Sequence, residues 1–121
     1  MSTAERATLP RAERLRGAGE LRRLFQRGAR LERASFVLVW LPAPGRRAAA
    51  FAASRGLGGS VPRNRARRRL REAYRRQKHL LPPGGIRVCF VARRRAIEAP
   101  FAALSAEVGE ALRAAGRRLR A

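Results

Sequence analysis

The sequence predicts a single domain of the α+β class, in which helices pack against one β-sheet. At 121 residues, the chain has room for one modest hydrophobic core. Two short apolar segments, 35–41 and 86–92, are rich in β-branched and aromatic residues, as strands are. Two long segments of helical periodicity lie between and after them.

The N-terminal part of the chain predicts an arm followed by a short helix. Residues 1–17 carry charges without sustained periodicity, so we expect a flexible basic arm there. Over 18–27, Leu21, Leu24 and Phe25 recur at helical spacing, and a glycine follows as a stop signal. We therefore expect a helix over 18–27.

The segment 35–41 predicts the most secure strand, because it ends at the turn sequence Pro-Ala-Pro-Gly at 42–45. The next segment, 47–53, is balanced between two structures. Its alanines favour a helix, whereas its short length between a Pro/Gly turn and a glycine cluster favours a strand. The residues alone leave this choice open.

The second half of the chain predicts a long helix, a strand and a final helix. The long helix begins near Pro62 and stops at the prolines and glycines of 82–85. The segment 86–92 is a second strand, and Pro100 opens the final helix. The apolar face of that helix is formed by Phe101, Leu104, Val108 and Leu112. A basic tail at 117–121 follows.

The charge of the chain indicates a polyanionic partner. The formal net charge is +21, and self-repulsion is severe unless a polyanion neutralises it. No apolar segment is long enough to span a membrane, and no amphipathic segment has the bulky apolar residues that bind one. The first ten residues lack the apolar run of a signal peptide. We therefore expect a cytoplasmic protein with no membrane partner and no small-molecule ligand.

The segment 63–78 predicts a helix with one apolar and one cationic face. The inward face is Ala66, Leu70, Ala73, Tyr74, Gln77 and Leu81. The outward face is Asn64, Arg67, Arg68, Arg71, Arg75 and Lys78, with Arg65, Arg69 and Arg76 on its flank. Surface helices normally mix charges of both signs, because like charges one turn apart repel. This face therefore favours nucleic-acid binding over simple solvation.

RNA is favoured over DNA as the nucleic acid. The chain has no helix-turn-helix spacing, zinc-finger ligand set or heptad dimer region, which removes the common DNA-reading modules. A dense arginine helix suits the backbone and shape of A-form RNA.

No set of residues indicates catalysis or a metal site within this chain. The sequence has no aspartate and its glutamates are scattered, whereas two-metal nucleases hold their ions with clustered carboxylates. The single histidine, His79, has no partners for a catalytic triad, and Cys89 lies in an apolar strand. We expect an exposed imidazole and a buried thiol.

The segment 54–74, SRGLGGSVPRNRARRRLREAY, resembles the signature of the bacterial ribonuclease P protein component, above all in V-x-R-N-R-x-[KR]-R-x-x-R-E at 61–72. The resemblance implies an α-β-β-β-α-β-α order and a four-stranded sheet packed by helices. It also implies a ribosomal protein S5 domain 2-like fold with a left-handed βαβ crossover. In that fold 47–53 is a strand, one further strand is present that the residues alone do not indicate, and the domain covers 18–116.

The same resemblance implies the function of an RNA-enzyme subunit. Proteins of this family bind the catalytic RNA of ribonuclease P and the 5′ leader of precursor tRNA, while the RNA performs the Mg²⁺-dependent hydrolysis. The matching contacts to the catalytic RNA are Arg63, Asn64, Arg65, Arg67, Arg68, Arg71 and Arg75. The leader cleft would be lined by Leu21, Phe25, Phe36, Trp40 and Arg55. Phe25 and Phe36 are equally compatible with the hydrophobic core.

The chain departs from the family pattern in two places. Gly56 follows Arg55 where the family usually has two adjacent cations, and the strand at 47–53 is richer in alanine than is common. The first departure weakens one RNA contact, and the second suggests a looser sheet. A ribosomal or other structural RNA-binding protein without a role in catalysis is the alternative, and a DNA-compacting protein is a third.

Overall fold

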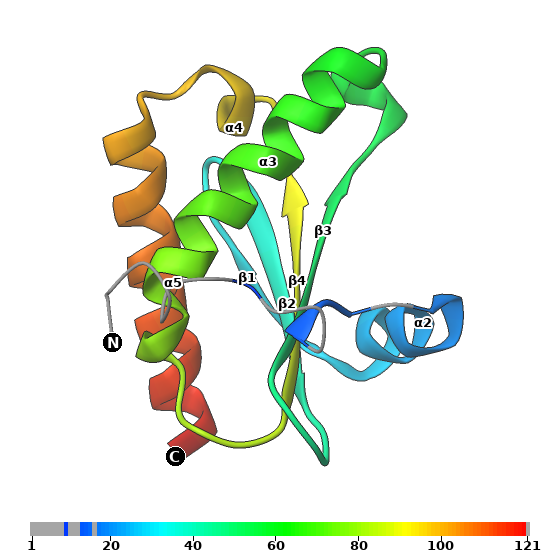
Figure 1. The fold of residues 1–121 in the computed structure, drawn as a ribbon, viewed down its shortest axis with the longest axis vertical. Helices are drawn as coiled ribbons and strands as arrows, with labels where there is room; N and C mark the ends of the chain where they lie inside the picture. Colours follow the sequence, from blue (N-terminus) through cyan, green and yellow to red (C-terminus); the bar gives the residue numbers. More distant parts are fainter. Residues whose placement is uncertain (1–8, 10–12, 16, 121) are drawn as a thin grey trace.

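A four-stranded sheet in the order β1-β2-β4-β3 organises the protein. The computed structural model describes residues 9, 13–15 and 17–120. The strands are β1 (Ala29–Glu32), β2 (Phe36–Pro42), β3 (Ala48–Ala53) and β4 (Ile86–Ala92). β1–β2 and β2–β4 pair antiparallel, whereas β3 pairs parallel to β4. The α+β class and the expected four-stranded sheet are confirmed (Figure 1).

β3 settles the choice that the sequence left open at 47–53. Its six residues are mostly alanine, and each pairs with β4, from Ala48 opposite Arg87 to Ala53 opposite Ala92. A partner strand therefore overrides the helical propensity of alanine. β1 is the strand that the residues alone did not predict, and it pairs with β2 through Ala29 opposite Trp40.

The parallel pair requires a crossover connection, and α3 (Ser60–Gln77) supplies it. A short 3₁₀ turn, η2 (Arg55–Leu57), precedes α3, and a second, η3 (Lys78–Leu80), follows it. The predicted long helix is confirmed, but it begins at Ser60 and ends at Gln77, before the expected stop at 82–85, because the chain continues there as η3. The left hand of this crossover stays a prediction.

Three further helices lie in the part of the chain that the structure describes. α2 (Ala18–Arg27) has the predicted bounds. At Gly28 an added Cβ would lie 2.5 Å from the Leu24 carbonyl oxygen and 2.8 Å from that of Trp40, so only glycine fits between α2 and the sheet. α4 (Arg95–Glu98) was not predicted. α5 (Phe101–Arg120) runs through most of the expected tail at 117–121, because Leu119 packs against the core.

The sheet has two different faces, which side-chain alternation along the strands defines. The α3/α5 face lies under α3 and α5, and its strand residues include Phe36, Leu38, Trp40, Phe51 and Phe90. The α2 face lies under α2, and its strand residues are Val37, Val39, Leu41, Ala48, Ala50, Ala52, Cys89 and Val91. Figure 1 shows α2 on one side of the sheet, with α3 and α5 on the other.

The described part of the expected flexible arm is docked onto the sheet. Leu9 and Leu15 are buried, and the Leu15 amide donates to the Ala49 carbonyl oxygen at 2.7 Å. Arg14 forms a parallel bridge with Ala49 at the free edge of β3. Residues 13–15 therefore extend the sheet, because β3 offers unpaired backbone groups at its edge.

Candidate nucleic-acid interface

The inward face of α3 is buried as its periodicity predicts. Ala66, Leu70, Ala73 and Tyr74 are fully buried against the sheet and α5. Gln77 is half-buried, and its Nε2 donates to the Ser105 carbonyl oxygen at 2.8 Å. This packing fixes which side of α3 faces solvent.

The outward face of α3 presents its cations mainly along the first two-thirds of the helix. Asn64, Arg65, Arg68 and Arg71 are exposed, and Arg63 and Arg67 are half-buried. Arg67 donates to the Asn64 side-chain oxygen. Arg68 makes no hydrogen bond or ion pair with any residue that the structure describes. Its guanidinium is therefore available to an external anion.

The last turns of α3 are partly neutralised within the helix. Arg75 lies 2.6 Å from the Glu72 carboxylate, and Arg76 lies 2.8 Å from it. The hydrogen bond from Arg75 lowers the pKa of Glu72, so this carboxylate stays ionised. Arg75 therefore offers less positive potential to RNA than the sequence suggested.

Lys78 does not belong to the outward face, so this prediction was wrong. The residue lies in η3, where the helical repeat of α3 no longer applies, and it is 6% exposed. Its Nζ lies 3.0 Å from a carboxylate oxygen of Glu13.

Two flanking arginines of α3 hold α4 in place. Arg69 donates to the carbonyl oxygens of Ala96, at 2.6 Å, and Ala99. Burial and the nearby Arg65 lower the pKa of Arg69. Arg65 donates to the Ile97 carbonyl oxygen at 3.2 Å. The Arg65 side chain thus serves packing as well as any contact with RNA.

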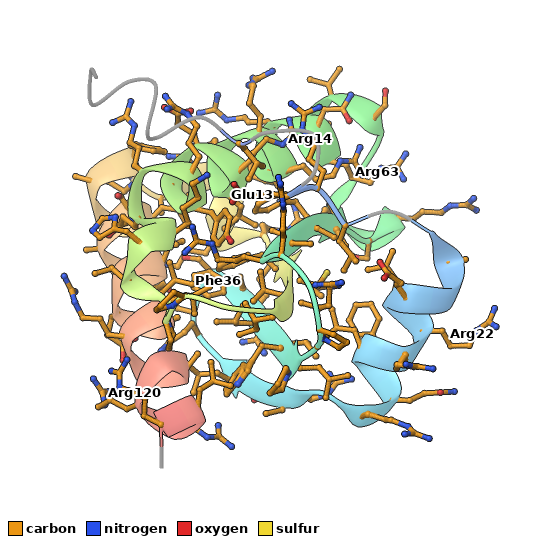
Figure 2. All side chains as sticks on the ribbon, turned by 60° about the horizontal axis from the view of Figure 1, so that its bottom comes forward. Glu13, Arg14, Arg22, Phe36, Arg63 and Arg120 are labelled. Atoms are coloured by element: carbon orange, nitrogen blue, oxygen red, sulfur yellow. The ribbon has the colours of Figure 1, made fainter. Side chains whose placement is uncertain are left out.

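The predicted leader cleft divides between the two faces of the sheet. Leu21 and Phe25 are half-buried on the α2 face. Phe36 and Trp40 are buried on the α3/α5 face, at 0% and 3% exposure, so their assignment to a cleft beside α2 was wrong. Figure 2 shows Phe36 inside the molecule and Arg22 and Arg63 at its surface. Arg55 is exposed in η2, ahead of α3.

The α2 face also contains apolar residues that the sequence analysis did not single out. Val37 and Leu41 of β2 and Val91 of β4 are half-buried on the α2 face, beside Leu21 and Phe25. Strand alternation was the signal that could have found them, because neighbours of a buried Phe36 must point to the opposite face.

A hollow of about 300 Å³ joins the two candidate surfaces. We call it the β3 groove. Leu21 contributes from α2, Ala50 and Phe51 from β3, Arg14 from the N-terminal segment and Arg71 from α3. The Arg71 guanidinium carbon lies 5.7 Å from the centre of the Phe51 ring, within cation–π range. An apolar floor and two arginines therefore meet at the edge of the sheet.

Other chemistry is sparse in the described part of the chain. No group of three or more His, Cys, Asp or Glu side chains is placed to hold a metal ion there. Cys89 is buried as predicted, and burial raises the pKa of its thiol to about 12. None of the described helices is long and apolar enough to cross a membrane.

Comparisons with known proteins agree on one family. The family model described as Ribonuclease P matches residues 9–116. The ribonuclease P protein component of Chloroflexus aggregans is 41% identical over 111 residues, which are 87% of this chain and 78% of that protein. The component of Desulfovibrio desulfuricans is 38% identical over 119 residues, covering 94% and 91%.

A comparison with solved structures shows a shared fold. The solved ribonuclease P protein of Staphylococcus aureus superposes with a TM-score of 0.74 at 20% identity. The superposition covers 87% of this chain and 96% of that protein. At this identity the likeness concerns the fold.

Proposed function

The chain belongs to the family of ribonuclease P protein components, and from this premise we propose which surfaces bind RNA. As a member, it is the protein subunit of an endoribonuclease whose metal-dependent catalysis is carried by RNA, and its partner is ribonuclease P RNA. We propose that the outward face of α3 binds that RNA. We further propose that the β3 groove and the α2 face hold the 5′ leader of precursor tRNA, with Mg²⁺ held mainly by the RNA. A cytoplasmic location stays a prediction.

The charge distribution on α3 supports the first assignment. Arg68 and Arg71 are exposed cations whose guanidinium groups are not engaged with described carboxylates, while Arg63 and Asn64 lie one to two turns away on the same helix. Planar guanidinium groups form paired hydrogen bonds with phosphate. The helix therefore offers several phosphate contacts along one line.

The composition of the β3 groove supports the second assignment. Its apolar floor lies beside Phe25, a half-buried ring, and its rim carries Arg14 and Arg71. Single-stranded RNA binds through stacking of bases on aromatic rings and through cations along its backbone. Of the predicted cleft, our proposal includes Leu21, Phe25 and the exposed Arg55, and it leaves out Phe36 and Trp40, which are buried on the other face.

Reconstitution tests the proposed function directly. We expect the protein to stimulate cleavage of precursor tRNA by a bacterial ribonuclease P RNA at low Mg²⁺, because it lowers the charge repulsion between the RNA strands. The measurement is the cleavage rate with and without protein. If the protein does not stimulate cleavage, the alternative of a ribosomal or other structural RNA-binding protein would be favoured.

The α3 assignment is tested by the double variant Arg68→Gln/Arg71→Gln. Loss of two phosphate contacts should weaken binding to ribonuclease P RNA and lower the slope of log affinity against log salt by roughly two. Arg113→Gln/Arg117→Gln removes the same charge from two exposed positions on α5 and serves as the matched control. Equal slopes for the two double variants would contradict the assignment.

A further inference from the structure

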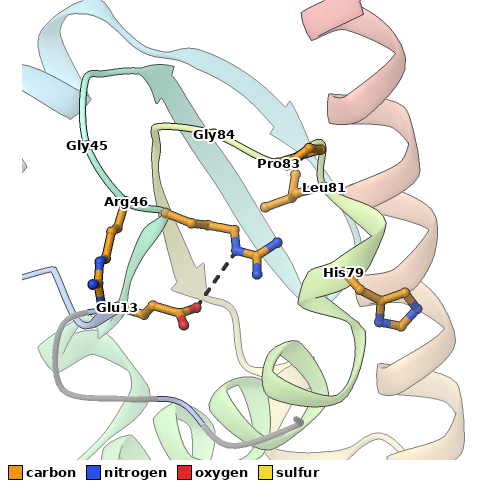
Figure 3. Close-up of a pocket in the computed structure, with 8 residues that line it drawn as sticks. Glu13, Gly45, Arg46, His79, Leu81, Pro83 and Gly84 are labelled. Carbon is orange, nitrogen blue, oxygen red and sulfur yellow. Dashed lines mark ion pairs between the residues drawn. The ribbon is translucent and has the colours of Figure 1, made fainter.

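A hollow of about 500 Å³ lies beyond the C-terminal end of α3, outside the two surfaces described above (Figure 3). The β2–β3 turn, η3 and the loop before β4 line it, and it is open to solvent. Its polar lining is Arg46, Arg47, His79 and Glu13, and Leu81 and Pro83 are apolar. Figure 3 shows Arg46 beside Glu13 at one side of the hollow and His79 at the other.

Arg47, in the wall of this hollow, and the neighbouring Lys78 both pair with the Glu13 carboxylate. Glu13 lies 3.0 Å from Lys78 Nζ and 3.8 Å from Arg47 Nε. Arg46 is exposed at the rim of the hollow. Among the described residues that line the hollow, two arginines therefore lie beside one carboxylate, and a bound oxyanion would balance the second positive charge.

Arg47 also has a buried donor without an acceptor. Its Nη1 donates to the Lys78 carbonyl oxygen at 2.9 Å, which holds the guanidinium in place. Its Nε is buried and makes no hydrogen bond within the described structure. Native proteins seldom leave a buried donor unpaired, and a water molecule or an ion is a recognised partner for such a group. The chemistry of this donor suits an oxyanion.

The size and the walls of the hollow suit more than a bare ion. Its volume falls in the range of small-molecule sites, of about 300–1,000 Å³. Leu81 and Pro83 give apolar surface against which a ribose or a base can lie. Glu13 lines this hollow, and the next residue, Arg14, lines the β3 groove. The two sites thus lie on either side of one short segment of chain.

We infer that this hollow binds a phosphate-bearing nucleotide of an RNA strand, with Arg46 and Arg47 as the phosphate ligands and Glu13 as an internal competitor. In the free protein the Glu13 carboxylate takes the place of a phosphate among the cations. When a nucleotide binds, its phosphate oxygens accept from Arg47 Nε and from the Arg46 guanidinium. The site lengthens the path of RNA beyond α3 and the β3 groove.

Substitution of Glu13 gives the sharpest test, because it should raise the affinity for the nucleotide, whereas a substitution that merely disrupts the site would lower it. Glu13→Gln removes the competing charge and should raise affinity for adenosine monophosphate by roughly three- to tenfold, whereas Arg46→Gln should lower it by a similar factor. Binding is followed at the site by NMR, through the amide signals of Gly45 and Gly84 and the Nε signal of Arg47. Adenosine, which lacks the phosphate, should leave these signals nearly unchanged.

Matched controls separate the site from the general charge of the protein. Glu110→Gln removes a carboxylate that pairs with Arg33 at 2.6 Å, and Arg22→Gln removes an exposed cation of α2. Neither should change the affinity for adenosine monophosphate at Gly45 and Gly84. Circular dichroism checks the fold of each variant, and Arg46→Gln keeps the test informative if Glu13→Gln unfolds, since Arg46 is exposed.

Three results would overturn the inference. They are unchanged or weaker binding in a folded Glu13→Gln variant, adenosine binding equal to that of adenosine monophosphate, and inorganic phosphate binding as tightly as the nucleotide. The titration needs no ribonuclease P RNA. Its failure would therefore leave the cleavage assay of the proposed function unaffected.

Discussion

The two faces of the sheet are built from different residues, and the difference fits the proposed division between a stabilising face and an RNA-binding face. On the α3/α5 face, Phe90 lies at the centre of an aromatic cluster, with ring centroids 5.2 Å from Phe36 and 5.7 Å from Phe51 and Tyr74. On the α2 face the strands carry valine, leucine, alanine and cysteine, and the aromatic ring comes from Phe25 of α2.

The helices that cover the two faces account for this difference. α3 and α5 are 18 and 20 residues long and seal their face, whereas α2 has 10 residues and leaves part of β3 to the groove. Large aromatic rings contribute most to stability where they are fully buried from water. Small side chains of β3 on the other side line the shallow hollow that we propose holds an unpaired base.

The largest expected effect is on stability, from Phe90→Ala. Removal of this fully buried ring should cost about 3–5 kcal/mol of the free energy of unfolding, through lost burial and a cavity. Val91→Ala is the matched control, because the neighbouring residue is half-buried on the α2 face and should cost about 1 kcal/mol. Urea unfolding followed by circular dichroism measures both. Equal losses would mean that the two faces do not differ in this way.

A smaller effect, on binding, is expected from Phe25→Ala. Loss of a stacking ring should weaken binding of leader-bearing precursor tRNA by about 1–2 kcal/mol, with little change for mature tRNA. Phe36→Leu is the control on the other face, and it should leave this preference intact. The measurement is the affinity of the reconstituted enzyme for the two tRNAs. If Phe25→Ala weakens both equally, Phe25 serves the core alone.

The sequence predicted the elements that carry their own periodicity. α2 and β4 have the expected bounds, and the inward face of α3 is the expected one. Two of the five residues that the family resemblance assigned to the leader cleft, Phe36 and Trp40, lie on the α3/α5 face. Alternation along β2 shows that their neighbours point toward α2.

The remaining errors concern segments whose structure depends on distant partners. β1 has the sequence ARLE, which carries no strand signal, and it forms because β2 pairs with it. Leu9 and Leu15 are too isolated to show a pattern, yet both are buried. Lys78 lies just past α3, where a helical projection no longer applies. Contacts between residues that are remote in sequence determine the structure at these positions, and such contacts cannot be predicted from local propensity.

The smallest expected effect concerns how firmly α2 covers its face, and Cys89 reports it. The thiol is buried, and burial raises its pKa to about 12, so at pH 8 it is protonated and shielded from Ellman's reagent. It reacts when α2 opens locally or when the whole domain unfolds. Gly19 is exposed in α2 with open space around an added Cβ, so Gly19→Ala should stabilise α2 by up to about 1 kcal/mol.

Labelling of Cys89 then distinguishes the two routes. If α2 opens on its own, Gly19→Ala should slow the labelling by roughly two- to fivefold. The control is Ala102→Gly, because Ala102 is the second residue of α5 just as Gly19 is the second residue of α2. This variant should destabilise α5 by a similar amount and leave the labelling rate of Cys89 unchanged. Faster labelling in Ala102→Gly would show that Cys89 reacts through global unfolding. The two faces would then be one cooperative unit, and access to the α2 face would depend on the groove and not on movement of α2.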